Sequence, residues 1–273
     1  MEIMQRVNQA YSSLPLPYKE ARNMALACSL EPLSEKPGCV TRNFDVNRNT
    51  LEMFISGGVN IFPAFFRLTE FLLQSNNPNG MYKFLHMAIL LSKMNRKGGQ
   101  INQGILEFSL PIVAAHVLYD PQSIHDGEYV LNKASEVLIS TGPEDFKELW
   151  LAKNAGMEIT QHGRGKGYHL EDHAVCSVLD YYKLEYEAEQ DRKRNATGLM
   201  HNKQFIKGFE DIIQTHDALK NAKGKFSHRT AEAYNIIMSK PQNLGVGPGL
   251  IADFVAVSIY LELAYAKDRE FIE

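Results

Sequence analysis

The sequence predicts an all-α protein, a single compact domain spanning residues 1–273 and built as an orthogonal bundle of about ten helices. Apolar residues recur at helical spacing along most of the chain, while the alternation typical of strands is nearly absent. The two most apolar runs, 105–119 and 250–266, are shorter than a membrane span and contain acidic residues, which indicates buried core helices. No low-complexity tract, repeat or change of composition marks a domain boundary.

The helices are expected in a continuous series, and local signals set several of their ends. Pro15 and Pro17 interrupt the first pair, Thr50 suits an N-cap, and Pro121 follows the end of the central apolar helix. The predicted helices are 1–30, 50–72, 81–94, 104–119, 132–140, 143–154, 174–195, 202–220, 227–239 and 250–266.

Two features inside this series point beyond simple helix packing. Gly57 and Gly58 each lower helix propensity by roughly 1 kcal/mol, so they predict that another backbone approaches their helix closely. Residues 31–50 contain two prolines, a glycine and several turn formers, and predict a long ordered loop. Ordered loops of this length inside a compact domain are usually functional.

Composition and charge exclude several classes of function. The net charge of −3 lacks the basic footprint of a nucleic-acid-binding protein. Cys28, Cys39 and Cys176 are widely spaced and form no CxxC pair, which argues against a disulfide framework or a zinc site. The polar N-terminus has no apolar signal region. We therefore expect a cytoplasmic protein without a nucleic-acid or membrane partner; a homodimer is left open.

The first of four notable polar loops is EPLSEKPGCVTR, residues 31–42. Lys36 and Arg42 on a turn next to a helix end suit phosphate binding. The alternative is a solvated proline turn.

The second loop, GGQINQG at 98–104, leads directly into the central apolar helix. Its glycines could present backbone N–H groups to an anion at the helix N-terminus, where the helix dipole also favours negative charge. The lysine and hydroxyl residue of a P-loop are missing. An ordinary connection between helices is the alternative.

The third and fourth polar segments, EAEQDRKRNATG at 187–198 and GVGPGLIADFVAVSIYLELA at 245–264, carry acidic residues and are called the third and fourth loops. Glu187 and Asp191 are four residues apart on a predicted helix, so both carboxylates face the same way and suit Mg²⁺. A solvated charged face is the alternative. Asp253 lies near the start of an apolar helix, after GVGPG. A buried carboxylate must be paired, bind a metal or accept bonds from backbone amides.

Histidines are concentrated in the loop QHGRGKGYHLEDH at 161–173. His162, His169 and His173 could suggest a metal site, but the HExxH pattern is absent. A surface loop rich in histidine is the favoured interpretation.

Taken in order, the polar loops resemble those of the triphosphoribosyl-dephospho-coenzyme A synthases. The first loop matches an E-x4-KPG-x-V pattern, GGQINQG takes the place of a GVNTHKG turn, and GPGLIAD takes the place of NPGxxAD. Ser56, Pro63 and Phe65 match a helix between the first two motifs, and EQDRKRNATGL at 189–199 resembles a divergent, archaeal-type branch of the family.

The chain also departs from the family pattern. Gln100, Asn102 and Gln103 stand where the turn would have Asn, His and Lys. Arg48 and Thr50 occupy the His and Asp positions of an HxDM element, and a later D-x-L-I-A-R-K segment is missing or shortened. These changes affect the expected chemistry more than the expected fold.

The resemblance implies an enzyme that binds ATP with Mg²⁺, attaches the ribose of ATP to the ribose of dephospho-coenzyme A or a related acceptor, and releases adenine. Such a transfer passes through an oxocarbenium-like centre. Lys36 and Arg42 would hold phosphates, and acidic residues would hold Mg²⁺ or act as a base. The implied residues are Glu31, Asn102 and Asp253 for catalysis; Lys36, Gly38, Arg42, Gly99, Gln100, Gly104, Arg192, Arg194 and Gly249 for nucleotide binding; and Glu187, Asp191 and Asp253 for Mg²⁺.

Two other classes of function compete with this hypothesis. One is a helical protein that binds a nucleotide without catalysis, and the other is a helical interaction module whose polar loops are only connections.

Overall fold

A computed structural model describes residues 6, 9–95, 101–158, 177–192 and 195–265. Within these ranges the chain forms helices and contains no strand, which confirms the predicted all-α class. The α-helices are α2 (Leu16–Leu30), α3 (Leu51–Asn60), α4 (Phe62–Ser75), α5 (Tyr82–Leu91), α6 (Gln103–Tyr119), α7 (Gly127–Ile139), α8 (Pro143–Glu158), α9 (Val178–Arg192), α10 (Ala196–Ile206), α11 (Glu210–Asn221), α12 (Phe226–Met238) and α13 (Pro248–Tyr265), with short 3-10 turns at Glu31–Leu33 (η1) and Pro241–Asn243 (η3).

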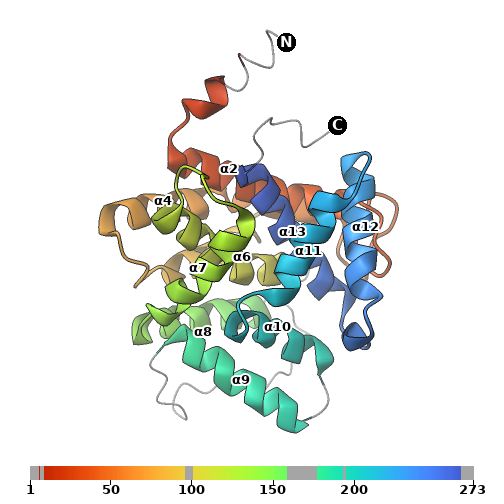
Figure 1. The fold of residues 1–273 in the computed structure, drawn as a ribbon. Coiled ribbons are helices and arrows are strands. Elements are labelled where there is room, and N and C mark those ends of the chain that lie inside the picture. The colour runs from red at the N-terminus through yellow and green to blue at the C-terminus, as the bar shows by residue number, and fades with distance from the viewer. Residues whose placement is uncertain (1–5, 7–8, 96–100, 159–176, 193–194, 266–273) are drawn as a thin grey trace.

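The two most apolar helices, α6 and α13, form the centre of the bundle. Residues on all their faces are buried, as the sequence predicts for core helices. Helix α13 packs against α2, α6, α11 and α12, while α2 and α9 lie at opposite ends of the molecule (Figure 1). By length and composition α13 could cross a membrane, but most of this stretch is buried inside the fold, which accounts for its apolar character.

Two predicted helices are each divided in the structure. The segment 50–72 forms α3 and α4, which meet at Ile61, because Pro63 supplies no N–H to continue the first helix. The segment 202–220 forms parts of α10 and α11, separated at Gly208 and Phe209, whose φ angles of 70° and 63° are left-handed. Because the apolar stripe continues through each break, the sequence pattern does not reveal that the helix is divided.

The glycine pair in α3 lies at close contacts, as predicted. A Cβ atom on Gly58 would lie 2.6 Å from Ser29 Oγ and 3.1 Å from the backbone oxygen of Ala25 in α2. A Cβ atom on Gly57 would lie 2.9 Å from Ile101 Cδ1. The pair therefore lets α3 lie against both α2 and the residues that precede α6.

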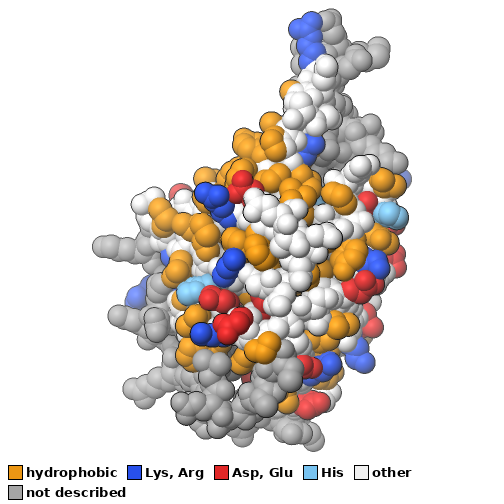
Figure 2. Space-filling view, turned by 90° about the vertical axis from the view of Figure 1, so that its left-hand side faces the viewer, with side chains coloured by type: hydrophobic (Ala, Val, Ile, Leu, Met, Phe, Trp, Pro, Cys, Tyr) orange, Lys and Arg blue, Asp and Glu red, His pale blue; other side chains and the backbone are white. Residues whose placement is uncertain are grey.

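The surface on the side of α4 carries mixed side chains. Among the residues coloured in Figure 2, acidic and basic groups are interspersed with apolar ones, and no extended region of one charge covers this face. This pattern agrees with the small net charge of −3.

Candidate functional site

A cavity of about 210 Å³ brings together three of the four polar loops. Its polar lining includes Glu31, Asn102 and Asp253, which come from η1, from the residue before α6 and from the second turn of α13. Val40, Phe54, Ile101 and Ala252 contribute to its apolar lining, and Gly38 and Gly249 also line it.

The KPG turn encloses Glu31 and packs against α13. Lys36 Nζ lies 3.1 Å from Glu31 Oε1, and it also donates hydrogen bonds to the backbone oxygens of Glu31 and Ser34. Gly38 has a left-handed φ of 82°, and a Cβ atom there would lie 2.7 Å from Pro248 Cγ. A glycine is therefore required at this position both for its backbone conformation and for the contact with α13.

Lys36 does not occupy the environment that the sequence suggested. Its side chain is fully buried, and its ammonium group has three oxygen contacts within its own loop. Lys36 thus pairs with Glu31 and does not face a phosphate across the cavity. Burial raises the pKa of the Glu31 carboxyl, with Lys36 acting in the opposite direction.

Asn102 and Gly104 form the entry to α6. Asn102 is 4% exposed, has a left-handed φ of 60°, and accepts the Leu106 N–H on its backbone oxygen at 2.9 Å. Both polar atoms of its carboxamide are buried without a hydrogen-bond partner in the described structure. A Cβ atom on Gly104 would lie only 2.1 Å from Asp253 Oδ2, so glycine lets the Asp253 carboxyl lie against the first turn of α6.

Asp253 is a half-buried acid in an apolar helix. Burial raises the pKa of its carboxyl well above the usual range, and the nearby Glu31 and Glu107 carboxylates raise it further. A carboxyl with a raised pKa can hold a proton near neutral pH and donate it.

The third loop contacts the fourth at the start of α10. The Asn195 side chain accepts the Gly198 N–H at 2.9 Å and caps the helix, while Thr197 Oγ1 accepts the Gly247 N–H at 2.6 Å. The start of α10 therefore lies close to the loop that leads into α13.

The predicted residues of this third loop are not gathered at the cavity as far as the structure describes them. Glu187 is exposed on α9 and is not among the residues that line the cavity. Asp191 and Arg192 end α9, but their side chains lie outside the described part of the structure, as do Arg194, Gly99, Gln100 and the histidine-rich loop. Among the described residues, no group of three or more His, Cys, Asp or Glu side chains could hold a metal ion.

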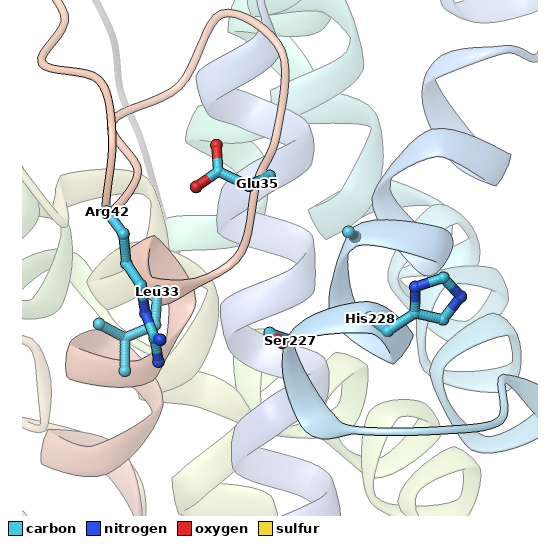
Figure 3. Close-up of a pocket in the computed structure, with 6 residues that line it drawn as sticks. Leu33, Glu35, Arg42, Ser227 and His228 are labelled. Atoms are coloured by element: carbon cyan, nitrogen blue, oxygen red, sulfur yellow. The ribbon is translucent and has the colours of Figure 1, made fainter.

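Arg42 faces a different hollow, of about 370 Å³. This hollow is also lined by Leu33 and Glu35 on the same loop and by Ser227 and His228 at the start of α12 (Figure 3). The side chain of Glu35 is held by Thr41 Oγ1 at 3.0 Å and Asn43 Nδ2 at 2.8 Å. Arg42 is exposed, and it is not brought together with Glu31 and Asp253.

A buried polar cluster around Glu107 lies behind the entry of α6 and is not among the predicted site residues. Glu107 Oε2 lies 2.9 Å from Lys153 Nζ in α8, 3.2 Å from the Tyr182 hydroxyl in α9 and 3.4 Å from His201 Nε2 in α10. Glu107 Oε1 accepts a hydrogen bond of 2.7 Å from Gln103 Nε2, which connects the cluster to the entry of α6.

Basic side chains favour the charged form of Glu107. Although burial opposes ionisation, Lys153 and His201 hold the pKa of the Glu107 carboxyl well below its usual range. The presence of one carboxylate inside an apolar helix is the signal that could have identified Glu107 from sequence, by the argument that selects Asp253. Its partners come from three other helices, and no local pattern indicates them.

Comparison with known proteins identifies a family for this chain but no individual relative. Searches of curated proteins and of solved structures found no match to the chain. A comparison with protein families matches residues 18–242 to the family described as ATP:dephospho-CoA triphosphoribosyl transferase, CitG. This match covers most of the chain and includes η1, the KPG turn, α6 and the Glu107 cluster. The chain therefore belongs to the ATP:dephospho-CoA triphosphoribosyl transferase family.

Proposed function

We propose that the cavity between Glu31, Asn102 and Asp253 is where this chain carries out the reaction of its family, the transfer of the triphosphoribosyl group of ATP to dephospho-CoA or a related nucleotide acceptor. One observation carries the proposal: residues from the segments 31–40, 101–102 and 249–253 meet at one cavity that is lined by two carboxyl groups, carboxamides and apolar side chains. Clefts of this kind, mostly apolar with a few convergent polar groups, are typical of small-molecule sites.

One helix end at the cavity favours a phosphorylated ligand. Gly249 lies in the first turn of α13, so the N-terminus of this helix borders the cavity. Unpaired N–H groups and the positive end of the helix dipole favour an anion at such positions. This arrangement supplies positive potential for a triphosphate beside the acidic side chains.

Asp253 is the residue best suited to assist the departure of adenine. In the reaction, an acceptor hydroxyl attacks C1′ of the ATP ribose and releases its proton, the bond from C1′ to the base nitrogen breaks, and adenine takes up one proton, so the number of protons is unchanged overall. A carboxyl whose pKa is raised by burial can supply that proton, as the general acid does in glycoside hydrolysis. The sequence suggested a base or a metal ligand at this position, and the raised pKa favours an acid.

The cavity also suits magnesium that arrives with the nucleotide. In nucleotide sites Mg²⁺ takes one or two carboxylates together with phosphate oxygens, and two carboxyl groups line this cavity. Glu31 and the phosphate oxygens would hold the ion, which would neutralise part of the triphosphate charge. With Mg²⁺ held by Glu31, the Asp253 carboxyl would keep its proton for the departing adenine.

The direct test measures adenine. Purified protein is incubated with ATP, MgCl₂ and dephospho-CoA, and free adenine and the mass of the nucleotide product are followed by liquid chromatography and mass spectrometry. We expect adenine and a product heavier than dephospho-CoA by one triphosphoribosyl group, both dependent on the acceptor. A sample without acceptor is the control. No adenine, together with no thermal shift by any nucleotide, would exclude the proposed function.

A further inference from the structure

We infer that Asn102 and Gln103 bind the base of the nucleotide and select adenine over guanine. The inference rests on the proposed function and adds to it the residues that determine base specificity. It is drawn from unpaired polar atoms at the entry to α6.

Three side-chain polar atoms at this entry are buried without a partner in the described structure: Asn102 Oδ1, Asn102 Nδ2 and Gln103 Oε1. Buried polar groups in native proteins are nearly always hydrogen-bonded, because an unpaired one destabilises the folded state. Asn102 lines the cavity, so a ligand there can supply the partners that its carboxamide lacks. Gln103 is the next residue in the chain and lies just behind this lining.

Gln103 presents an acceptor because Glu107 fixes its orientation. The Glu107 carboxylate only accepts hydrogen bonds, and it also receives donors from Lys153 and Tyr182. The Gln103 amide must therefore direct its NH₂ group to Glu107 Oε1, at 2.7 Å. Its carbonyl oxygen, Oε1, is left for another donor.

Asn102 is held by its surroundings against the wall of the cavity. Its left-handed backbone, with φ of 60°, starts α6. Its Nδ2 lies 3.2 Å from the position that a Cβ atom on Gly57 would take, so the carboxamide sits against α3 at a glycine. Its carboxamide offers an NH₂ group as donor and a carbonyl oxygen as acceptor.

Adenine has the complementary groups. Its N6 amine donates two hydrogens and its N7 accepts one, and a single asparagine carboxamide can bind both atoms at once. The second amine hydrogen then matches the Gln103 carbonyl, while apolar side chains such as Val40, Phe54 and Ile101 suit the faces of the ring. Guanine presents acceptors at both O6 and N7, and its O6 would face carbonyl oxygens.

This assignment also puts the base beside its acid. The Asp253 carboxyl lies against Gly104, two residues after Asn102, and it lines the same cavity. Base recognition and protonation of the leaving group would then occur at one turn of α6.

The experiment compares the binding of ATP and GTP, without acceptor, to the full chain by isothermal titration calorimetry. We expect the wild type to bind ATP at least 100-fold more tightly than GTP. Asn102→Gly keeps a residue that tolerates the left-handed backbone, and Gln103→Met removes the amide at similar length. We expect Asn102→Gly to reduce the ATP:GTP ratio below 10-fold by weakening ATP binding, while GTP binding changes less than 3-fold. We expect Gln103→Met to reduce the ratio at least 3-fold.

Asn221→Ala removes a carboxamide at an exposed position on α11, outside the cavity lining, and should leave the ratio unchanged. The melting temperature of each variant establishes that it is folded, and Gln103→Met provides the test if Asn102→Gly is not. A wild type that binds ATP and releases adenine without discriminating against GTP overturns the inference alone, as do folded variants that keep the full ratio. A wild type that binds neither nucleotide overturns the proposed function together with the inference.

Discussion

Single residues determine the chemistry that the cavity can perform, and Asp253 depends most on its neighbours. Its carboxyl can lie against α6 only because residue 104 has no Cβ atom, since one would be 2.1 Å from Asp253 Oδ2. The pKa of Asp253 is raised by burial and by the nearby Glu31 and Glu107 carboxylates. An acid in this setting is less favourable for folding at high pH than an asparagine of the same shape.

The first prediction concerns the activity of Asp253→Asn. Removing the proton donor should lower the rate of adenine release at least 100-fold, within the range general acids usually contribute. The wild-type rate should fall as pH rises through the raised pKa, because only the protonated carboxyl donates. Quantifying adenine from pH 5 to 9 tests both effects. Asp217→Asn, at an exposed position on α11, is the control. A variant that keeps the wild-type rate would remove Asp253 from the mechanism.

Asp253→Asn should lower activity but raise the stability of the folded protein at alkaline pH. The folded state binds the Asp253 proton more tightly than the unfolded state, so the wild type loses stability as pH rises through the raised pKa. The variant has no such loss. Its free energy of unfolding in urea should therefore exceed that of the wild type at pH 8, with the difference disappearing in acid. Equal stabilities at pH 8 would show that Asp253 titrates normally.

The sequence identified the residues whose local setting was unusual. Asp253 stands out as an acidic residue in an apolar helix. GGQINQG stands out as a polar turn that leads directly into an apolar helix. Lys36 and Arg42 looked alike in the sequence, but the structure buries one against Glu31 and exposes the other at a separate hollow. Their difference depends on how the 31–42 loop folds, which residue types alone do not determine.

Secondary-structure elements were predictable in kind and less so in their limits. The central helices follow from unbroken apolar runs, whereas the breaks at Ile61 and Gly208 occur within patterns that continue across them. Contacts between elements were the hardest feature to predict from the sequence. Glu107 meets Lys153, Tyr182 and His201 only because α8, α9 and α10 pack around α6.

The prediction for this group of helices is that Glu107→Gln destabilises the fold by about 3–5 kcal/mol, as breaking a buried ion pair typically does. Lys153, 11% exposed at its side chain, would lose the negative charge 2.9 Å away. Urea denaturation at pH 7 gives the value. Adding Lys153→Met should restore part of the loss, because the buried charge is then removed.

A surface pair provides the matched control for this measurement. Lys133 Nζ and Glu136 Oε1 lie 2.6 Å apart, but the Glu136 side chain is 52% exposed. Glu136→Gln should change stability by less than about 1 kcal/mol. A similarly small effect of Glu107→Gln would mean that its cluster does not hold the four helices together.

At the scale of the whole molecule, a second buried network connects the two central helices, α6 and α13, to α2. His116 in α6 lies 3.2 Å from Glu20 Oε1 in α2, and the Tyr260 hydroxyl of α13 also donates to Glu20. On its other side, His116 Nε2 is 3.0 Å from Ser123 Oγ. Despite opposing burial, Glu20 raises the pKa of the His116 imidazole, so the ion pair is favoured in the folded state.

The two networks should give the protein a maximum of stability between acid and alkaline pH. Glu107 has a lowered pKa, so its contribution is present above the ordinary value of 4.5 and is lost as pH falls below it. His116 has a raised pKa, so its contribution is complete below the ordinary value of 6.5 and is lost as pH rises through the folded value. Asp253 acts in the same direction as His116, and the alkaline comparison therefore uses the Asp253→Asn background.

Urea unfolding from pH 4 to 9 should show Glu107→Gln flattening the acid side of the curve of stability against pH and His116→Gln flattening the alkaline side. Curves that stay parallel to those of their parent proteins would mean that these pairs do not govern the pH dependence of folding.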